Sequence, residues 1–141
     1  MDHIAIMKKS WGLIPKILSG EKKIESRWHQ TKRAPWNRVT KDETVYFKNA
    51  GEGIIAQATI SEVMQYEIHT PKDLKDILDK YAKDTCLTKT NPKEWGRLPR
   101  YCILLRLTCP KKISKPFHIT KKGFGIGAAW ICIEDIANIT L

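Results

Sequence analysis

The segment Gly20-Glu21-Lys22-Lys23-Ile24-Glu25-Ser26-Arg27 decides our interpretation of the fold, because it leads from a short apolar helix into an amphipathic strand. The helix is predicted over residues 13–18. Pro15 suits only the first turn of a helix, and Gly20 can end it in the left-handed conformation that glycine adopts without strain. The charged residues that follow the glycine therefore begin a new element.

This new element is predicted to be a strand over residues 23–29. Side chains alternate between the two faces of a strand, so Ile24 and Trp28 share one face while Glu25 and Arg27 share the other. We expect the apolar pair to lie in the core. Lys22 stands directly after the glycine turn, where the backbone can aim it at the same space as the charged pair.

The charged face of this strand has two interpretations. Two cations and one carboxylate that converge on one hollow can hold a phosphate or a base edge, with the carboxylate orienting the arginine. Alternatively, the strand lies on the surface and carries an ion pair that solvent screens, which is the commoner outcome for such charges. The residue types alone leave both interpretations open.

The rest of the chain predicts a sheet with few helices. Strands are expected at 44–48, 54–63, 101–107 and 128–133, and a turn joins the first two. A second helix is expected to start at Thr70, with Pro71 at its first position and Asp73 closing a capping box. Its apolar stripe consists of Leu74, Ile77, Leu78 and Tyr81. We predict the α+β class, as a closed or half-closed β-barrel with peripheral helices, in a single domain over residues 1–141.

The charge of the chain points to a polyanionic partner. The 141 residues are 42% hydrophobic and 28% charged, as in ordinary globular domains, but their net charge is +10. Such a surplus suits a polyanion or an anionic membrane surface. The basic residues gather at 1–41 and 111–122, which favours one basic face. No stretch is long enough to span a bilayer, and the first residues lack a secretory signal.

Cysteine and glycine spacing gives no sign of a metal or cofactor site. The four cysteines lack the spacing of a zinc site, the four histidines are scattered, and the glycines at 123, 125 and 127 precede no helix. Cys102 and Cys132 lie in apolar runs, where a free thiol behaves as a small hydrophobe. We therefore expect unpaired thiols, a reducing cytoplasmic setting, no metal and no cofactor.

The opening segment resembles the signature of the ASCH domain family, Gly-x-Lys-x-x-Glu-x-Arg, at all four fixed positions: Gly20, Lys22, Glu25 and Arg27. The apolar helix before it and the two strands after it are similar to the family plan, so the resemblance covers residues 10–66. It implies a PUA-like β-barrel with a cavity that the motif lines. It also implies RNA or a modified nucleobase as the ligand.

The resemblance also implies an enzymatic alternative. In related amidohydrolases that act on N4-acetylcytidine, the motif lysine activates a threonine nucleophile, and this chain has Glu25 at the threonine position. A carboxylate serves better as an acid or base than as that nucleophile. Other members are reported as ribonucleases, for which Lys22, Glu25 and Tyr46 are the candidate catalytic residues here.

The leading hypothesis from the sequence is an RNA-binding module, with tRNA, other structured RNA or single-stranded RNA as partner. Trp36 is the stacking candidate because it lies in a basic loop, whereas Trp28 is assigned to the core. Trp11 is expected either at the pocket mouth or against the first helix, and Trp95 as a lid. A protein-interaction subunit with a basic docking face is the third hypothesis. The candidate RNA contacts are Lys22, Lys23, Glu25, Arg27, Lys32, Arg33, Trp36 and Arg38.

Overall fold

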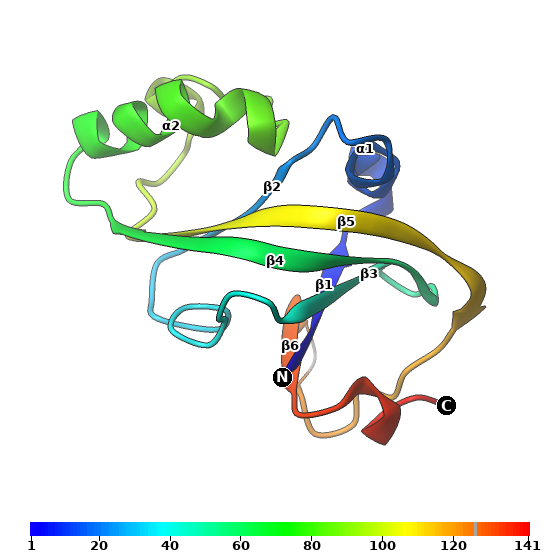
Figure 1. Cartoon of the computed structure of the whole chain (residues 1–141). Helices are drawn as coiled ribbons and strands as arrows, with labels where there is room; N and C mark the ends of the chain where they lie inside the picture. The colour runs from blue at the N-terminus through cyan, green and yellow to red at the C-terminus, as the bar shows by residue number, and fades with distance from the viewer. Residues whose placement is uncertain (126) are drawn as a thin grey trace.

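The computed structural model of the chain describes residues 1–125 and 127–141 (Figure 1). The strands are β1 (Asp2–Met7), β2 (Ile24–His29), β3 (Thr44–Asn49), β4 (Ile54–Glu67), β5 (Tyr101–Phe117) and β6 (Trp130–Ile133). The helices are α1 (Leu13–Ser19) and α2 (Pro71–Thr85), and short 3-10 turns lie at Lys9–Trp11, Pro92–Glu94 and Ile136–Asn138.

The strands form one curled sheet in the order β2-β5-β4-β3-β1-β6. β1 and β3 are parallel, and the other neighbours are antiparallel. In Figure 1, β1 and β6 cross the long strands β4 and β5 at a steep angle, so the sheet curls strongly. β2 and β6 are the two ends of the order, which makes the architecture a half-barrel. The predicted α+β class is confirmed, with the β-barrel in its half-closed form.

Local signals place the helices as the sequence predicts. Pro15 lies in the first turn of α1, and Gly20 ends that helix at φ 84°, in the left-handed region. The capping box of α2 is present, because the Thr70 side chain accepts from the Asp73 backbone N–H and the Asp73 carboxylate accepts from the Thr70 backbone N–H. Each helix therefore starts or stops where a short-range interaction fixes it.

The core has two parts that border the functional region. One part packs α1 on the concave side of the sheet, around Phe47 and Ile103. The other packs α2 on β2 and β5, and it contains Ile24 together with the predicted apolar stripe of α2. A third cluster lies near β6 and the C-terminal turn. β2 thus lies between the two helices, with core on the side of Ile24.

β4 runs to Glu67, beyond its predicted end at 63, and two larger features of the sheet also differ from the sequence prediction. β1 was not predicted, because it lies between β3 and β6 and is buried along nearly its whole length, so it lacks polar alternation. β5 extends to Phe117 instead of ending at 107. Thr108 pairs with Thr59 and Lys111 with Gln57, so Cys109 and Pro110 together oppose one residue. This bulge accommodates the proline and the positive φ of 50° at Cys109.

All four cysteines are free, and burial raises the pKa of the Cys102 thiol. Among the described residues, no helix has the length and apolar character required to cross a membrane. The described residues also contain no cluster of three or more His, Cys, Asp or Glu side chains suited to a metal ion.

Candidate functional site

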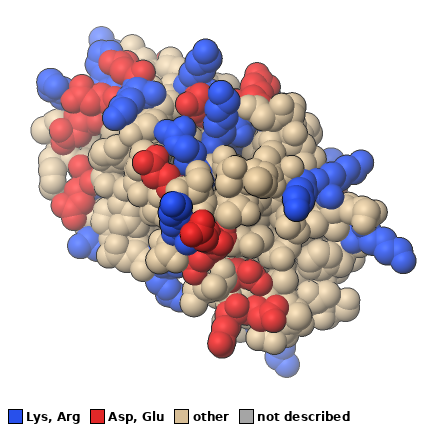
Figure 2. Space-filling model, in the orientation of Figure 1, with Lys and Arg blue, Asp and Glu red and all other residues tan. Residues whose placement is uncertain are grey.

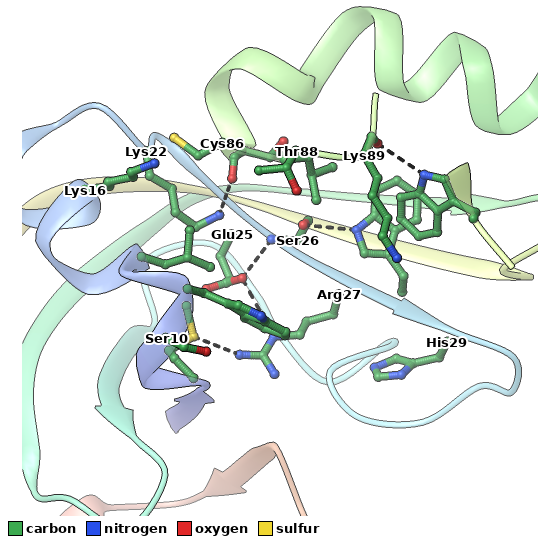
Figure 3. A pocket seen from close by; sticks show the side chains of 17 residues that line it. Ser10, Lys16, Lys22, Glu25, Ser26, Arg27, His29, Cys86, Thr88 and Lys89 are labelled. Atoms are coloured by element: carbon green, nitrogen blue, oxygen red, sulfur yellow. Dashed lines mark hydrogen bonds and ion pairs between the residues drawn. The ribbon is translucent and has the colours of Figure 1, made fainter. Parts of the chain in front are cut away.

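A cavity of about 670 Å³ lies between α1, β2 and the C-terminal end of α2 (Figure 3). The motif contributes three side chains to its wall, Lys22, Glu25 and Arg27, which come from the turn after α1 and from β2. The structure therefore brings the three charged motif residues to one hollow. The other lining residues are Met7, Ser10, Trp11, Leu13, Lys16, Ser26, Trp28, His29, Thr85, Cys86, Leu87, Thr88, Lys89 and Trp95.

Lys22 is buried, with only 2% of its surface exposed. Its Nζ donates to the carbonyl oxygen of Ile24 at 2.8 Å and to that of Thr85 at 2.7 Å. The Thr85 carbonyl is one of those at the end of α2 that have no partner within the helix, and a cation is favourable there. Burial lowers the pKa of Lys22, and the nearby Glu25 carboxylate opposes that effect. Lys22 thus holds the end of α2 against β2.

Glu25 is also buried, at 3% exposure. Its Oε1 accepts from the Ser26 backbone N–H at 3.0 Å and lies 3.8 Å from the Arg27 Nε. Its Oε2 is buried and has no hydrogen-bond partner within the described residues. Figure 3 shows the carboxylate between the ends of Lys22 and Arg27. A buried carboxylate oxygen without a donor is costly, so this atom is where a ligand would gain most.

Arg27 joins the two ends of the curled sheet. From β2, its Nη1 donates to the Ala129 carbonyl oxygen at 3.1 Å, and its Nη2 lies 3.5 Å from the Ile6 carbonyl oxygen in β1. The guanidinium also lies over the Trp130 ring, 5.2 Å from its centroid. The side chain is only 12% exposed. Burial lowers the pKa of Arg27 while Glu25 opposes the shift, and an arginine stays charged regardless.

A buried histidine holds the Trp130 ring in place. The Trp130 Nε1–H donates to the His3 Nδ1 at 3.2 Å, and the His3 Nε2 lies 2.9 Å from the Glu43 Oε1. Burial lowers the pKa of His3, which keeps the ring neutral and Nδ1 free to accept. Burial also works against the charge of Glu43, yet hydrogen bonds from the Thr40 N–H and from His3 bring its pKa to about 2. The ring on which Arg27 lies is thereby fixed.

The interpretation of the charged face as a solvent-screened surface pair is wrong, because both Glu25 and Arg27 are largely buried. The expectation that the two cations point free donors into the hollow also needs correction. Two of the three Lys22 N–H groups and the terminal nitrogens of Arg27 are already bonded to the protein. The Glu25 Oε2 is the motif atom that is buried without a hydrogen-bond partner in residues 1–125 and 127–141, and it is an acceptor.

Three tryptophans contribute to the apolar part of the cavity wall. Trp28 is half-buried and lines the cavity while packing against the α2 core, so its assignment to the core holds only in part. Its ring meets that of Trp95 edge-on, at 4.9 Å between centroids, and its Nε1–H donates to the Ser26 Oγ at 3.1 Å. Trp11 lines the cavity, and 61% of its surface is exposed. Of its two predicted places, the pocket and the first helix, the cavity wall corresponds to the first.

Several candidate residues from the sequence lie away from the cavity wall as residues 1–125 and 127–141 define it. Trp36 packs edge-on against Tyr101 at 5.0 Å. Tyr46 packs edge-on against Phe117 at 6.3 Å, because its neighbours Val45 and Phe47 take the face of β3 beneath α1. The catalytic role expected for Tyr46 beside Lys22 and Glu25 therefore does not fit the geometry. The exposed candidates outside the wall are Lys23, Lys32, Arg33 and Arg38.

The structure adds lining residues that the sequence did not single out. Lys16 comes from α1, and Lys89 comes from the segment after α2. His29, at the end of β2, has a buried Nε2 without a partner in the described residues. Burial lowers the pKa of His29, and Arg33 and Arg27 lower it further, so the ring is neutral at pH 7. Only the docking of α2 brings Lys89 to β2, so no local pattern could reveal it.

Charges on the visible face in Figure 2 are mixed. The α2 region, at the upper left, carries acidic and basic side chains side by side, in line with the exposed pairs Lys72–Asp76 and Lys75–Asp79. This face is therefore not one continuous basic patch. Besides the motif residues Lys22 and Arg27, the cavity wall contains two further basic residues, Lys16 and Lys89.

No family model and no curated protein matches the sequence. Solved structures do match the fold. The ASCH protein from Zymomonas mobilis has a TM-score of 0.69 at 12% identity, covering 99% of this chain and 96% of that chain. A serine-to-alanine variant of the same protein gives 0.70 at 12% identity, over 97% and 91% of the two chains. The N-terminal domain of McrB from Staphylothermus marinus gives 0.55 at 14% identity, over 94% and 87%.

The chain therefore has the fold of the ASCH structures along nearly its whole length. The motif that carries the sequence resemblance lies at the cavity of that fold.

Proposed function

We propose that this chain is an RNA-binding module that takes a single unpaired base into the cavity beside α1 and α2. The observation that carries the proposal is the composition of the cavity wall. A buried, hydrogen-bonded charge cluster with one unpaired carboxylate oxygen stands next to three tryptophans. A volume of about 670 Å³ falls in the range of small-ligand sites, roughly 300–1,000 Å³.

The surroundings of the cavity support a nucleic acid over a free small molecule. The chain carries a net charge of +10, and Lys16 and Lys89 at the cavity can contact the phosphates that flank an inserted base. Aromatic side chains beside cations are the usual combination for unpaired bases. The chain has the fold of the ASCH structures, and the sequence resemblance to that family implies RNA as the ligand.

Trp11→Ala is expected to weaken the binding of a short single-stranded RNA at 0.15 M salt by roughly 5- to 150-fold, because stacking on one aromatic is worth about 1–3 kcal/mol per base. Trp11 is mostly exposed, so the variant should unfold at the same urea concentration as the wild type. Fluorescence anisotropy with a labelled nine-nucleotide RNA measures the affinity.

Two further variants sharpen the Trp11 experiment. Trp11→Phe keeps an aromatic face and should retain most of the affinity, whereas Leu141→Ala removes an exposed apolar side chain away from the cavity and should change nothing. Equal affinity of Trp11→Ala and wild type would show that RNA binds elsewhere. Binding that disappears at 0.15 M salt in the wild type would point to nonspecific charge attraction alone.

A second candidate function is catalysis on RNA or on a modified nucleoside. The observation that favours it is the lowered pKa of Lys22 beside Glu25, since such a pair can exchange a proton with a bound base. Two observations count against catalysis. Lys22 already donates to two carbonyl oxygens, and Tyr46 lies on the face of β3 that points away from α1. The wild-type chain incubated with RNA or with N4-acetylcytidine discriminates the two functions by the appearance of product.

A further inference from the structure

We infer that the cavity selects a base by its hydrogen-bond-donor edge, with the Glu25 Oε2 accepting from an exocyclic amino group. Cytosine and adenine carry such a group, whereas uracil presents a carbonyl oxygen in its place. The inference rests on the proposed function, because it concerns the same cavity.

Hydrogen bonds within the protein already engage most of the charged groups of the motif. Both terminal nitrogens of Arg27 and two of the Lys22 N–H groups are committed to backbone carbonyl oxygens. The Glu25 Oε2 is buried and has no partner within the described residues. A phosphate in this place would bring its own acceptor oxygens to a carboxylate acceptor. The phosphates of a bound RNA therefore stay outside, near Lys16 and Lys89, and a donor occupies the position beside Glu25.

The net charge of the motif cluster disfavours a cationic ligand group beside Glu25. Lys22 and Arg27 together carry two positive charges against the single negative charge of Glu25, so the cluster has a net charge of +1. A cationic amine would lose its hydration and enter a positive environment. A neutral N–H group can satisfy the carboxylate oxygen without that cost. The exocyclic amino group of a base is neutral and a good donor.

The aromatic wall of the cavity suits a flat ligand. Trp11, Trp28 and Trp95 line the same cavity, and Trp28 and Trp95 meet edge-on. Such a wall suits a flat ring that stacks on one aromatic face and meets the edge of another. A flat ring that also carries a neutral amino group is a nucleobase such as cytosine. Uracil has the same ring, but when its N3–H points at a carboxylate the carbonyl oxygens on both sides approach it as well and are repelled.

The test compares two RNAs of nine nucleotides, one made only of uridine and one with a cytidine at the central position. Wild-type chain should bind the cytidine-containing RNA roughly 5- to 150-fold more tightly, since one good base contact discriminates by about 1–3 kcal/mol. Glu25→Gln keeps the size of the side chain but adds donors, so it can pair with the uracil carbonyl. In this variant the ratio of the two affinities should fall from that wild-type preference to near one.

Glu21→Gln is the matched control, because Glu21 lies in the same segment, is exposed and is not part of the cavity wall. It makes the same charge change and should keep the wild-type preference. Equal binding of the two RNAs by wild type would overturn the inference while leaving RNA binding intact. A third RNA has adenosine at the central position. Failure of the wild-type chain to bind any of the three RNAs would overturn the proposed function itself. A preference that survives in Glu25→Gln would assign selectivity to another residue and also overturn the inference.

Discussion

Arg27→Met is expected to lower the free energy of unfolding by about 3–5 kcal/mol, the usual cost of removing one partner from a buried charge pair. The substitution keeps a long side chain but removes one of the two donors to the Ala129 carbonyl oxygen, the other being the Ile6 backbone N–H. It also leaves Glu25 without the nearest guanidinium. It also releases the contact between β2 and β1 at Ile6. Because β2 and β6 lie at opposite ends of the strand order, Arg27 closes the half-barrel by side-chain bonds where backbone pairing stops.

Urea unfolding followed by circular dichroism measures this loss, and Arg33→Met serves as the control. Arg33 is exposed, so its removal should change the free energy of unfolding by no more than about 0.5 kcal/mol. Hydrogen exchange localises the effect, since the Ile6 amide that donates to the Ala129 carbonyl oxygen should exchange faster. If Arg27→Met were as stable as Arg33→Met, Arg27 would be free for a ligand and our description of the closure would be wrong.

Lys22→Met is expected to cost about 2–3 kcal/mol of unfolding free energy, in the range of hydrogen bonds to charged groups, roughly 1.5–3 kcal/mol. Methionine has a similar length but donates no hydrogen bond, so the carbonyl oxygens of Ile24 and Thr85 lose their buried donor. The loss should be felt at the end of α2, where the Lys23 backbone N–H also bonds to the Asp84 carbonyl oxygen. The amides around that helix end should therefore exchange faster in the variant.

Lys23→Met is the matched control for this prediction. Lys23 is the next residue along the chain, undergoes the same chemical change and is exposed, so its removal should change the stability by no more than about 0.5 kcal/mol. Unfolding curves of the two variants are compared in the same urea series. Coincident curves would mean that the Lys22 amine does not hold α2 in place. Direct contact of this amine with the ligand would then be favoured.

Short-range signals account for the parts of the fold that the sequence predicts. Gly20 ends α1 and Thr70 begins α2 through interactions within a few residues, so each boundary is visible in the sequence. The alternation of β2 correctly separates Ile24 from Glu25 and Arg27. β1 escapes prediction because it is buried along nearly its whole length, which removes the polar alternation on which strand prediction depends.

The candidate site is predictable only in the identity of its charged residues. Alternation places Glu25 and Arg27 on one face of β2, but it cannot reveal that Arg27 bonds to Ala129 or that Lys22 bonds to Thr85. These partners are far away in sequence, and the docking of α2 and the curl of the sheet bring them close. The same docking brings Lys89 to the cavity. Trp36 is expected to stack on a base because it lies in the polar loop after the motif strand, but its ring packs on Tyr101 outside the cavity wall.

Protection of Cys86 from alkylation by bound RNA tests the central claim most directly, because Cys86 is partly exposed in the cavity wall and Cys109 is exposed outside it. The chain is treated with iodoacetamide, with and without the cytidine-containing RNA at about ten times its Kd, and each thiol is followed by mass spectrometry. We predict that labelling of Cys86 slows about tenfold, in proportion to the free fraction of the protein, while labelling of Cys109 is unchanged. RNA that binds without slowing the labelling of Cys86 would contradict the account.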